Sequence, residues 1–156
     1  MNHNPRDIQQ VSDAFKILFR DHEELSDLIM QKNGLHVKLD ELRAQARVGA
    51  CGPNDQPSVW LRRFTRAIVD EVRELSESIA WKWWRPQNKT DLQNVRVELV
   101  DILHFVFSAA AAAGMTGEDL VKTYYEKRAL NAKRQNVGFV EGDNKEAGIG
   151  RLHGLD

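Results

Sequence analysis

The longest apolar stretch of the chain, residues 95–115, constrains the fold more than any other feature. Valine, leucine, isoleucine and phenylalanine cover nearly every face of a helix built from it, so we expect a central, buried helix. Polar residues interrupt the stretch, among them Glu98, Asp101, His104 and Ser108. Because charged side chains are costly inside a bilayer, we do not expect a membrane span.

Prolines and glycines divide the rest of the chain into helix-like runs. The four prolines lie at the edges of these runs, as Pro53 and Pro57 do in the loop 48–58. We predict Ser58 and Asp91 as N-caps and Gly114 as a stop signal. The predicted helices cover residues 8–31, 35–46, 58–79, 91–113 and 117–135.

The predicted fold is an all-α helical bundle, because no convincing alternating strand pattern accompanies these helices. With 156 residues the chain is long enough for one core, so we expect a single domain over 1–156. From about residue 137 the sequence is rich in glycine, and we expect a flexible C-terminal arm there.

Composition narrows the classes of function. The formal net charge is −1, so the basic footprint of a protein that binds a nucleic-acid polymer is missing. Cys51 is the sole cysteine, which excludes an internal disulfide and a cysteine-based zinc site. The first residues are polar and show no secretory signal, so we expect a cytoplasmic protein.

Two of the predicted helices carry paired carboxylates on or beside their apolar faces. At helical periodicity Glu71 lies within the apolar stripe of 58–79 and Glu74 at its edge, while Glu98 and Asp101 share one face of 91–113. Four acids turned toward an interior repel one another unless something compensates them. Hard divalent cations take oxygen ligands, so the pattern predicts a Mg²⁺ or Mn²⁺ site.

Two other readings of the acids remain open. They could pair with arginines such as Arg73 or Arg96 on exposed faces. A di-iron bundle also uses helical carboxylates, but it needs two Glu-x-x-His pairs, and here only Asp101 and His104 resemble one.

Cationic and aromatic residues elsewhere suggest a polyphosphate ligand. Lys127, Asn131 and Arg134 recur at helical spacing and form one face of 117–135, which is also typical of a solvated helix face. The run Trp81-Lys82-Trp83-Trp84 offers an aromatic wall for a base and a lysine for phosphate, with a core plug as the alternative.

Three runs in order resemble the all-α NTP pyrophosphatase superfamily, and in particular its dimeric dUTPases and phage dCTP pyrophosphatases. The first, 60–84, contains Glu71, Glu74 and a Trp-Lys-x-Trp motif. The second, 94–105, contains Glu98 and Asp101, and the third covers 124–142. The likeness extends over roughly residues 35–145.

The resemblance implies hydrolysis of a deoxynucleoside triphosphate to the monophosphate and pyrophosphate by a homodimer or higher homo-oligomer. It implies that Glu71, Glu74, Glu98 and Asp101 bind Mg²⁺, with Mn²⁺ as a possible substitute. The catalytic water would be held by Glu71 or Glu74. The triphosphate would be bound by Lys82, Lys127, Asn131, Arg134 and Lys145, and the base and sugar would be bordered by Trp81, Trp84 and Phe139.

One departure bears on the base. Dimeric dUTPases read uracil with Gln and Asn four residues apart on an early helix, and the best register here places His36 and Asp40 at those positions. An ionised Asp only accepts hydrogen bonds, so it suits the amine of cytosine better than uracil. We therefore expect dUTP and/or dCTP as substrate. The alternatives are a MazG-like housecleaning pyrophosphatase for other or non-canonical nucleotides, purines included, and a non-catalytic helical interaction protein.

Overall fold

All the regular structure in the described part of the chain is helical. The computed structural model describes residues 5–84, 86 and 89–137. The prediction of an all-α fold with five helices is confirmed for these residues. The helices are α1 Pro5–Lys32, α2 Leu39–Arg47, α3 Gln56–Glu77, α4 Leu92–Ala112 and α5 Gly117–Val137.

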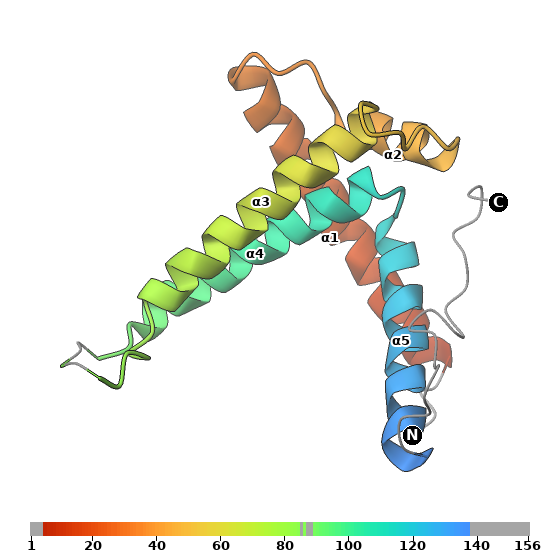
Figure 1. The fold of residues 1–156 in the computed structure, drawn as a ribbon. Coiled ribbons are helices and arrows are strands. Elements are labelled where there is room, and N and C mark those ends of the chain that lie inside the picture. The colour runs from red at the N-terminus through yellow and green to blue at the C-terminus, as the bar shows by residue number, and fades with distance from the viewer. Residues whose placement is uncertain (1–4, 85, 87–88, 138–156) are drawn as a thin grey trace.

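The helices form two arms that meet at a corner (Figure 1). Helices α3 and α4 are antiparallel neighbours and make one arm, which ends in the loop that joins them. Helix α5 lies beside the N-terminal part of α1 and makes the other arm. The chain bends by 101° between α4 and α5, and α2 packs at the corner.

The hydrophobic core lies at the corner. Phe19 of α1 packs against Phe107 of α4 with ring centroids 5.0 Å apart, and Trp60 of α3 packs against Phe64 at 5.5 Å. The remaining buried side chains of this core come from α1, α2 and α4: Met30, Leu39, Leu42, Ala110, Ala111 and Ala112. The core therefore packs around one end of the α3–α4 arm, and the other end projects from the rest of the molecule.

The prediction that the fourth helix is buried on nearly every face is wrong for its first half. Leu99 is 52% exposed and Leu103 43% exposed. Within the described residues Glu98 is the sole buried side chain in the first fifteen residues of α4, 92–106. The physical reason is that α3 covers one side of this half, while the fully buried core residues of α4 lie within 107–112 and Phe105 only packs against their edge.

Local signals placed some helix ends correctly. Asp91 caps α4, because its side chain accepts hydrogen bonds from the backbone N–H groups of Gln93 and Asn94, both at 3.1 Å. Gly114 follows the end of α4 with a φ of +85°, which suits glycine at a helix stop.

Other helix ends differ from the prediction. Helix α2 begins at Leu39 and not at residue 35, and the side chain that accepts the N–H of Leu39 is Asp27 of α1 at 3.3 Å. Helix α3 begins at Gln56, so Ser58 is no N-cap, and its hydroxyl donates to the carbonyl of Cys51 at 3.0 Å.

A polar network closes the corner between α2 and α5. Arg47 donates to the carbonyl of Gly114 at 2.8 Å and pairs with Asp119 at 2.5 Å. Thr116 donates to Asp119 through its N–H and its hydroxyl. Burial acts to raise the pKa of Asp119, but the hydrogen bonds from Thr116 and the charge of Arg47 outweigh it and lower the pKa.

Among the described residues, no single helix combines the length and the apolar character needed to cross a membrane. Residues 92–112 and 117–135 reach this length and apolar character only when they are taken together, and the two helices are bent by 101° relative to each other.

We predict that Gly117→Ala destabilises the protein, because α1 and α5 touch at this residue. A Cβ on Gly117 would lie 2.6 Å from the carbonyl oxygen of Phe15, so the two helices would have to separate. The expected loss is about 1–3 kcal/mol of unfolding free energy, measured by urea denaturation. Helix propensity alone favours alanine by up to about 1 kcal/mol, so a gain in stability would contradict the close contact. Glu118→Ala is the control, since it removes only an exposed ion pair with Lys16.

We predict a second, pH-dependent loss of stability from His22. This histidine is buried in α1, its Nε2 lies 2.8 Å from the hydroxyl of Ser108 and 3.1 Å from that of Ser26, and its ring stacks on His104. Burial, and then the charge of His104, lower the pKa of His22 from 6.5 to about 4. Between these two values the unfolded chain binds a proton that the folded chain does not, so acidification destabilises the fold.

His22 changes the free energy of unfolding by at most about 1.4 kcal/mol per pH unit. This effect is absent above the pKa that histidine has in the unfolded chain. Urea denaturation of the wild type and His22→Gln across this pH range measures it. The difference in stability between the two proteins should shrink as the pH falls. Parallel curves would show that His22 takes up its proton equally in both states.

Candidate functional site

Three of the four predicted acids converge where α3 and α4 face each other. Glu71 and Glu74 lie one helical turn apart on α3, and Glu98 lies opposite them on α4. One carboxylate oxygen from each residue lies within 4.8 Å of the other two. The convergence follows from the antiparallel packing of two helices that each present acids toward their shared contact.

Glu98 is the most enclosed member of the cluster. Its residue is only 7% exposed, although the arm around it contains little other buried surface. Asn94, one turn earlier on α4, donates from its Nδ2 to Oε1 of Glu98 at 3.0 Å. The same Nδ2 donates to the hydroxyl of Ser78 at 2.7 Å. The buried carboxylate is therefore held by a neutral amide and not by a cation.

Glu71 shows the electrostatic cost of the cluster. Burial, followed by the charges of Glu74, Asp101 and Glu98, raises the pKa of its carboxyl. Within the described parts of the chain, neither Glu71 nor Glu98 has a lysine or arginine ion-pair partner. The negative charge in the cluster is thus not balanced by these neighbours.

The alternative hypothesis, that the acids pair with arginines, holds only for Glu74 among the described residues of the cluster. Arg73 lies 3.3 Å from Glu74, but it also pairs with Asp70 at 3.1 Å and with Glu77 at 2.7 Å. The Glu74 side chain remains 46% exposed, so this contact is largely solvated and weak. Arg96, the other arginine considered, forms no ion pair with the described acids.

Asp101 stands apart from the close trio. Its charge acts on Glu71, yet its oxygens are not among those that lie within 4.8 Å of one another. Its Oδ1 lies 3.8 Å from Nδ1 of His104. The ring of His104 is half-buried and stacks on His22, so it bridges α4 to α1.

The residues present suit a hard divalent cation. Their donors are all carboxylate oxygens, the set that Mg²⁺ and Mn²⁺ prefer. Burial and the mutual repulsion of the carboxylates raise the pKa of Glu71. A bound cation would relieve this repulsion, so the cluster favours cation binding. Glu71, Glu74 and Glu98 form the described donor set, and Asp101 lies next to it.

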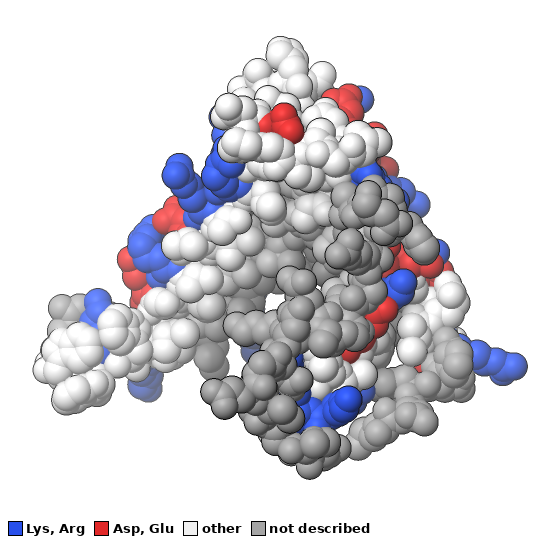
Figure 2. Space-filling view, turned by 45° about the vertical axis from the view of Figure 1, so that its right-hand side comes forward, with Lys and Arg blue, Asp and Glu red and all other residues white. Residues whose placement is uncertain are grey.

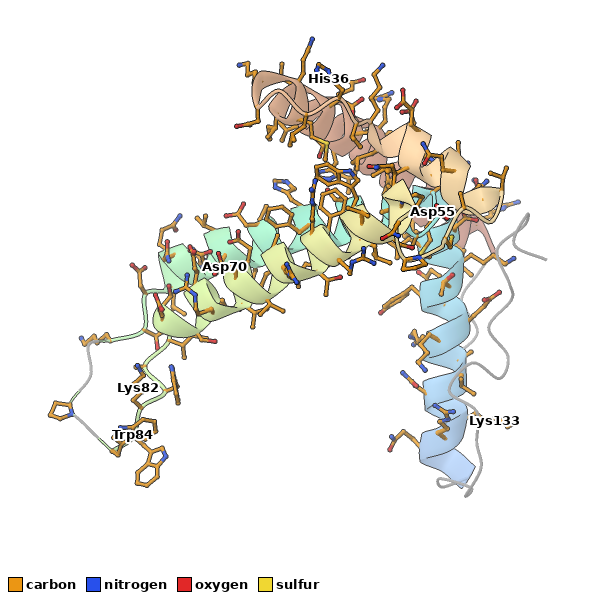
Figure 3. The ribbon with its side chains drawn as sticks, turned by 45° about the horizontal axis from the view of Figure 1, so that its top comes forward. His36, Asp55, Asp70, Lys82, Trp84 and Lys133 are labelled. Atoms are coloured by element: carbon orange, nitrogen blue, oxygen red, sulfur yellow. The ribbon has the colours of Figure 1, made fainter. Side chains whose placement is uncertain are left out.

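The aromatic run lies at the tip of the same arm, beyond the acids. Lys82 and Trp84 lie in the loop between α3 and α4, as Figure 3 shows. Trp81 and Trp84 meet edge to face with centroids 5.4 Å apart, and the ammonium of Lys82 lies 5.3 Å from the Trp81 ring. Trp83 is 90% exposed and the other two are half-exposed, so these rings do not plug the core.

The residues expected to bind phosphate on α5 lie on the other arm. Lys127 and Asn131 line a shallow groove with Tyr124, and Arg134 is buried. Figure 3 places Lys133, next to Arg134, near the end of α5, across the molecule from Lys82 and Trp84. One chain therefore does not bring these α5 side chains to the acids.

The residues expected to read the base are separated from the acids as well. His36 lies in the segment before α2 and lines a cavity of about 580 Å³ between α1 and α2, together with Asp27 and Glu41. Asp40 lies on α2, and its side chain accepts the N–H of Glu41 at 2.8 Å. The two residues do not share a helix, because α2 begins at Leu39. Phe139 and Lys145 lie outside the described residues.

Two polar residues of the site carried no prediction of their own. Asn94 and Ser78 connect the buried acid to the end of α3. The available signal was the position of Asn94 four residues before Glu98, which puts the two side chains on one helix face. Ser78 had no such signal, because its partner belongs to another helix.

Comparison with known proteins places the α3–α4 segment within a known family. A model of the dUTPase family matches residues 14–113, a segment that contains all four predicted acids and stops before α5. The dCTP pyrophosphatases of Enterobacteria phages T4 and LZ5 are each 31% identical over 51% of this chain. A DNA replication protein of phage T4 is 30% identical over 50% of the chain and 26% of its own length.

The match covers only 61% and 60% of the two pyrophosphatases. No solved structure matches the chain significantly. The family model nevertheless covers well over half of the sequence and includes the whole α3–α4 arm. On this basis the chain belongs to the dUTPase family.

Proposed function

We propose that this protein is a Mg²⁺-dependent pyrophosphatase that hydrolyses dUTP and/or dCTP to the monophosphate and pyrophosphate. The observation that carries the proposal is the carboxylate cluster of Glu71, Glu74 and Glu98. The described lysine and arginine side chains do not balance its negative charge, and the cluster lies within the segment that the family model matches. The names of the two phage relatives support the substrate class. Such an activity would act on the nucleotide pool of the cytoplasm.

In the proposed reaction the oxygen of a water molecule attacks the α-phosphorus. A P–O bond forms there, and the bond from the α-phosphorus to the bridging oxygen breaks, which releases pyrophosphate. Glu71 takes the proton of the water, a role supported by its raised pKa, and Glu74 is the alternative base. A bound Mg²⁺, or Mn²⁺ in its place, would supply charge neutralisation at the phosphate oxygens.

The loop and α5 provide the remaining contacts in this proposal. Trp81 and Trp84 stack on the base, and Lys82 binds phosphate, because these three groups already lie together at the tip of the arm. Asp40 lies on α2, away from this loop, so its carboxylate would favour cytosine, whose amine can donate to it, only at the site of a second copy. Lys127 and Asn131 bind the triphosphate at the acids of a second copy, since α5 lies on the other arm of their own chain. Arg134 joins them only by turning outward, because it is buried in its own chain.

A homo-oligomer is supported by apolar surface that one chain leaves uncovered. Figure 2 shows uncharged surface running along the α3–α4 arm to its tip. Several apolar side chains of this arm are 43% or more exposed: Val69, Val72, Leu92, Val97, Leu99, Val100 and Leu103. A second set lies along one face of α1: Ile17, Leu18, Leu25, Leu28 and Ile29. A helix pair with such a face resembles half of a four-helix bundle, so we assign these faces to a second copy of the chain.

We predict that purified protein releases pyrophosphate from dCTP or dUTP in the presence of Mg²⁺, and that Glu98→Gln lowers kcat by about 100-fold or more. The amide keeps the shape of the side chain but removes its charge. Asp70→Asn is the matched control, because Asp70 lies next to Glu71 on α3 but contacts only Arg73 in the described structure.

The assay uses a panel of deoxynucleotides and ribonucleotides. Turnover confined to purine nucleotides would replace the pyrimidine assignment with a housecleaning activity. Absence of turnover with every nucleotide would refute the hydrolase proposal, whereas full activity of Glu98→Gln would refute the assignment of the acids as its metal site.

We further predict that the double variant Leu99→Glu/Leu103→Glu shifts the protein toward the monomer. Charged side chains on the face assigned to the partner must lose their hydration on association, which weakens it strongly. Sedimentation velocity of the wild type and the variant gives the masses. Val48→Glu is the control, because Val48 is 82% exposed but lies in the loop after α2. A monomeric wild type would contradict the assignment of these faces.

A further inference from the structure

The buried carboxylate of Glu98 depends on one amide. Apart from the neighbouring Glu71 carboxyl, Asn94 is its hydrogen-bond partner among the described residues, with Nδ2 3.0 Å from Oε1. An amide donor orients a carboxylate oxygen without cancelling its charge. The contact therefore places no positive charge beside Glu98 and engages only its Oε1. A lysine or arginine at this position would instead compete with a metal for the carboxylate.

Asn94 is itself braced from the opposite helix. The second hydrogen of its amide goes to the hydroxyl of Ser78 at 2.7 Å, so both hydrogens of the Nδ2 group are used. Ser78 follows the last residue of α3, and its carbonyl accepts the N–H of Asp91 at 2.9 Å. The amide thus lies between the end of the helix that carries Glu71 and Glu74 and the acid on α4.

We propose that Asn94 is a positioning residue of the metal site, which orients the Glu98 carboxylate through its direct hydrogen bond. The inference rests on the proposed function, because it requires that the acids bind a divalent cation. Partners of metal ligands act in this way in other sites, and their removal commonly weakens metal affinity by about 10–100-fold.

The experiment separates positioning from simple bracing of the two helices. Mn²⁺ alone is titrated calorimetrically into the full chain as wild type, Asn94→Leu and Ser78→Ala. Both variants lose the contact between Asn94 and Ser78, but Ser78→Ala keeps the contact between Asn94 and Glu98. We expect Asn94→Leu to weaken Mn²⁺ binding by about tenfold or more and Ser78→Ala by less than about twofold.

Circular dichroism and the melting temperature without metal report on folding. We expect both variants to lose stability, and Asn94→Leu more than Ser78→Ala, since it also removes the amide donor of the buried Glu98. Asn94→Ala replaces Asn94→Leu if leucine prevents folding. A melting-temperature loss without a difference in Mn²⁺ affinity between the variants would reduce Asn94 to a structural role and overturn the inference.

The remaining outcomes are distinct. If the wild type binds Mn²⁺ and the Asn94 variants bind it equally well, the positioning role is wrong and the proposed function stands. If the wild type binds no Mn²⁺, both the positioning role and the proposed metal-dependent function fail.

Discussion

The burial of a carboxylate between two helices is the constraint on which the rest of the structure depends. Glu98 is enclosed in an arm that otherwise buries little, and Glu71 and Glu74 add charge at the same point. Desolvated charges need compensation, and the amide of Asn94 supplies a hydrogen bond without supplying charge. Arg73 reaches only the outer acid, Glu74. The compensation must come from outside these residues, and a divalent cation suits an all-oxygen donor set.

The same arm supports the proposed association with a second copy. Its core lies at the corner, so the acids and the aromatic loop project on two helices whose outer faces are apolar and exposed. The basic residues of α5 lie on the other arm. A second copy placed on the α3–α4 face would cover the apolar surface and bring other side chains toward the acids. Metal binding and association are therefore expected to support each other.

Sequence reasoning succeeded where the physics is local. Asp91 and Gly114 were predicted as helix ends because each acts on its own backbone, and the convergence of Glu71 with Glu98 followed from helical periodicity. It failed where partners are distant: Asp27 of α1 sets the start of α2, and Ser78 braces Asn94 from another helix. The apolar residues on nearly every face of this helix predicted that residues 92–106 are buried. Hydrophobicity alone does not say whether the same chain or a second copy covers them.

A crystal structure of the protein grown with Mn²⁺, with anomalous scattering recorded at the manganese absorption edge, tests the central claim most directly. The account predicts an anomalous peak about 2–2.4 Å from carboxylate oxygens of Glu71, Glu74 and Glu98. A map without a peak at these residues, with lysine or arginine side chains of a second copy paired with Glu71 and Glu98 instead, would show that the acids are structural ion-pair partners and would contradict it.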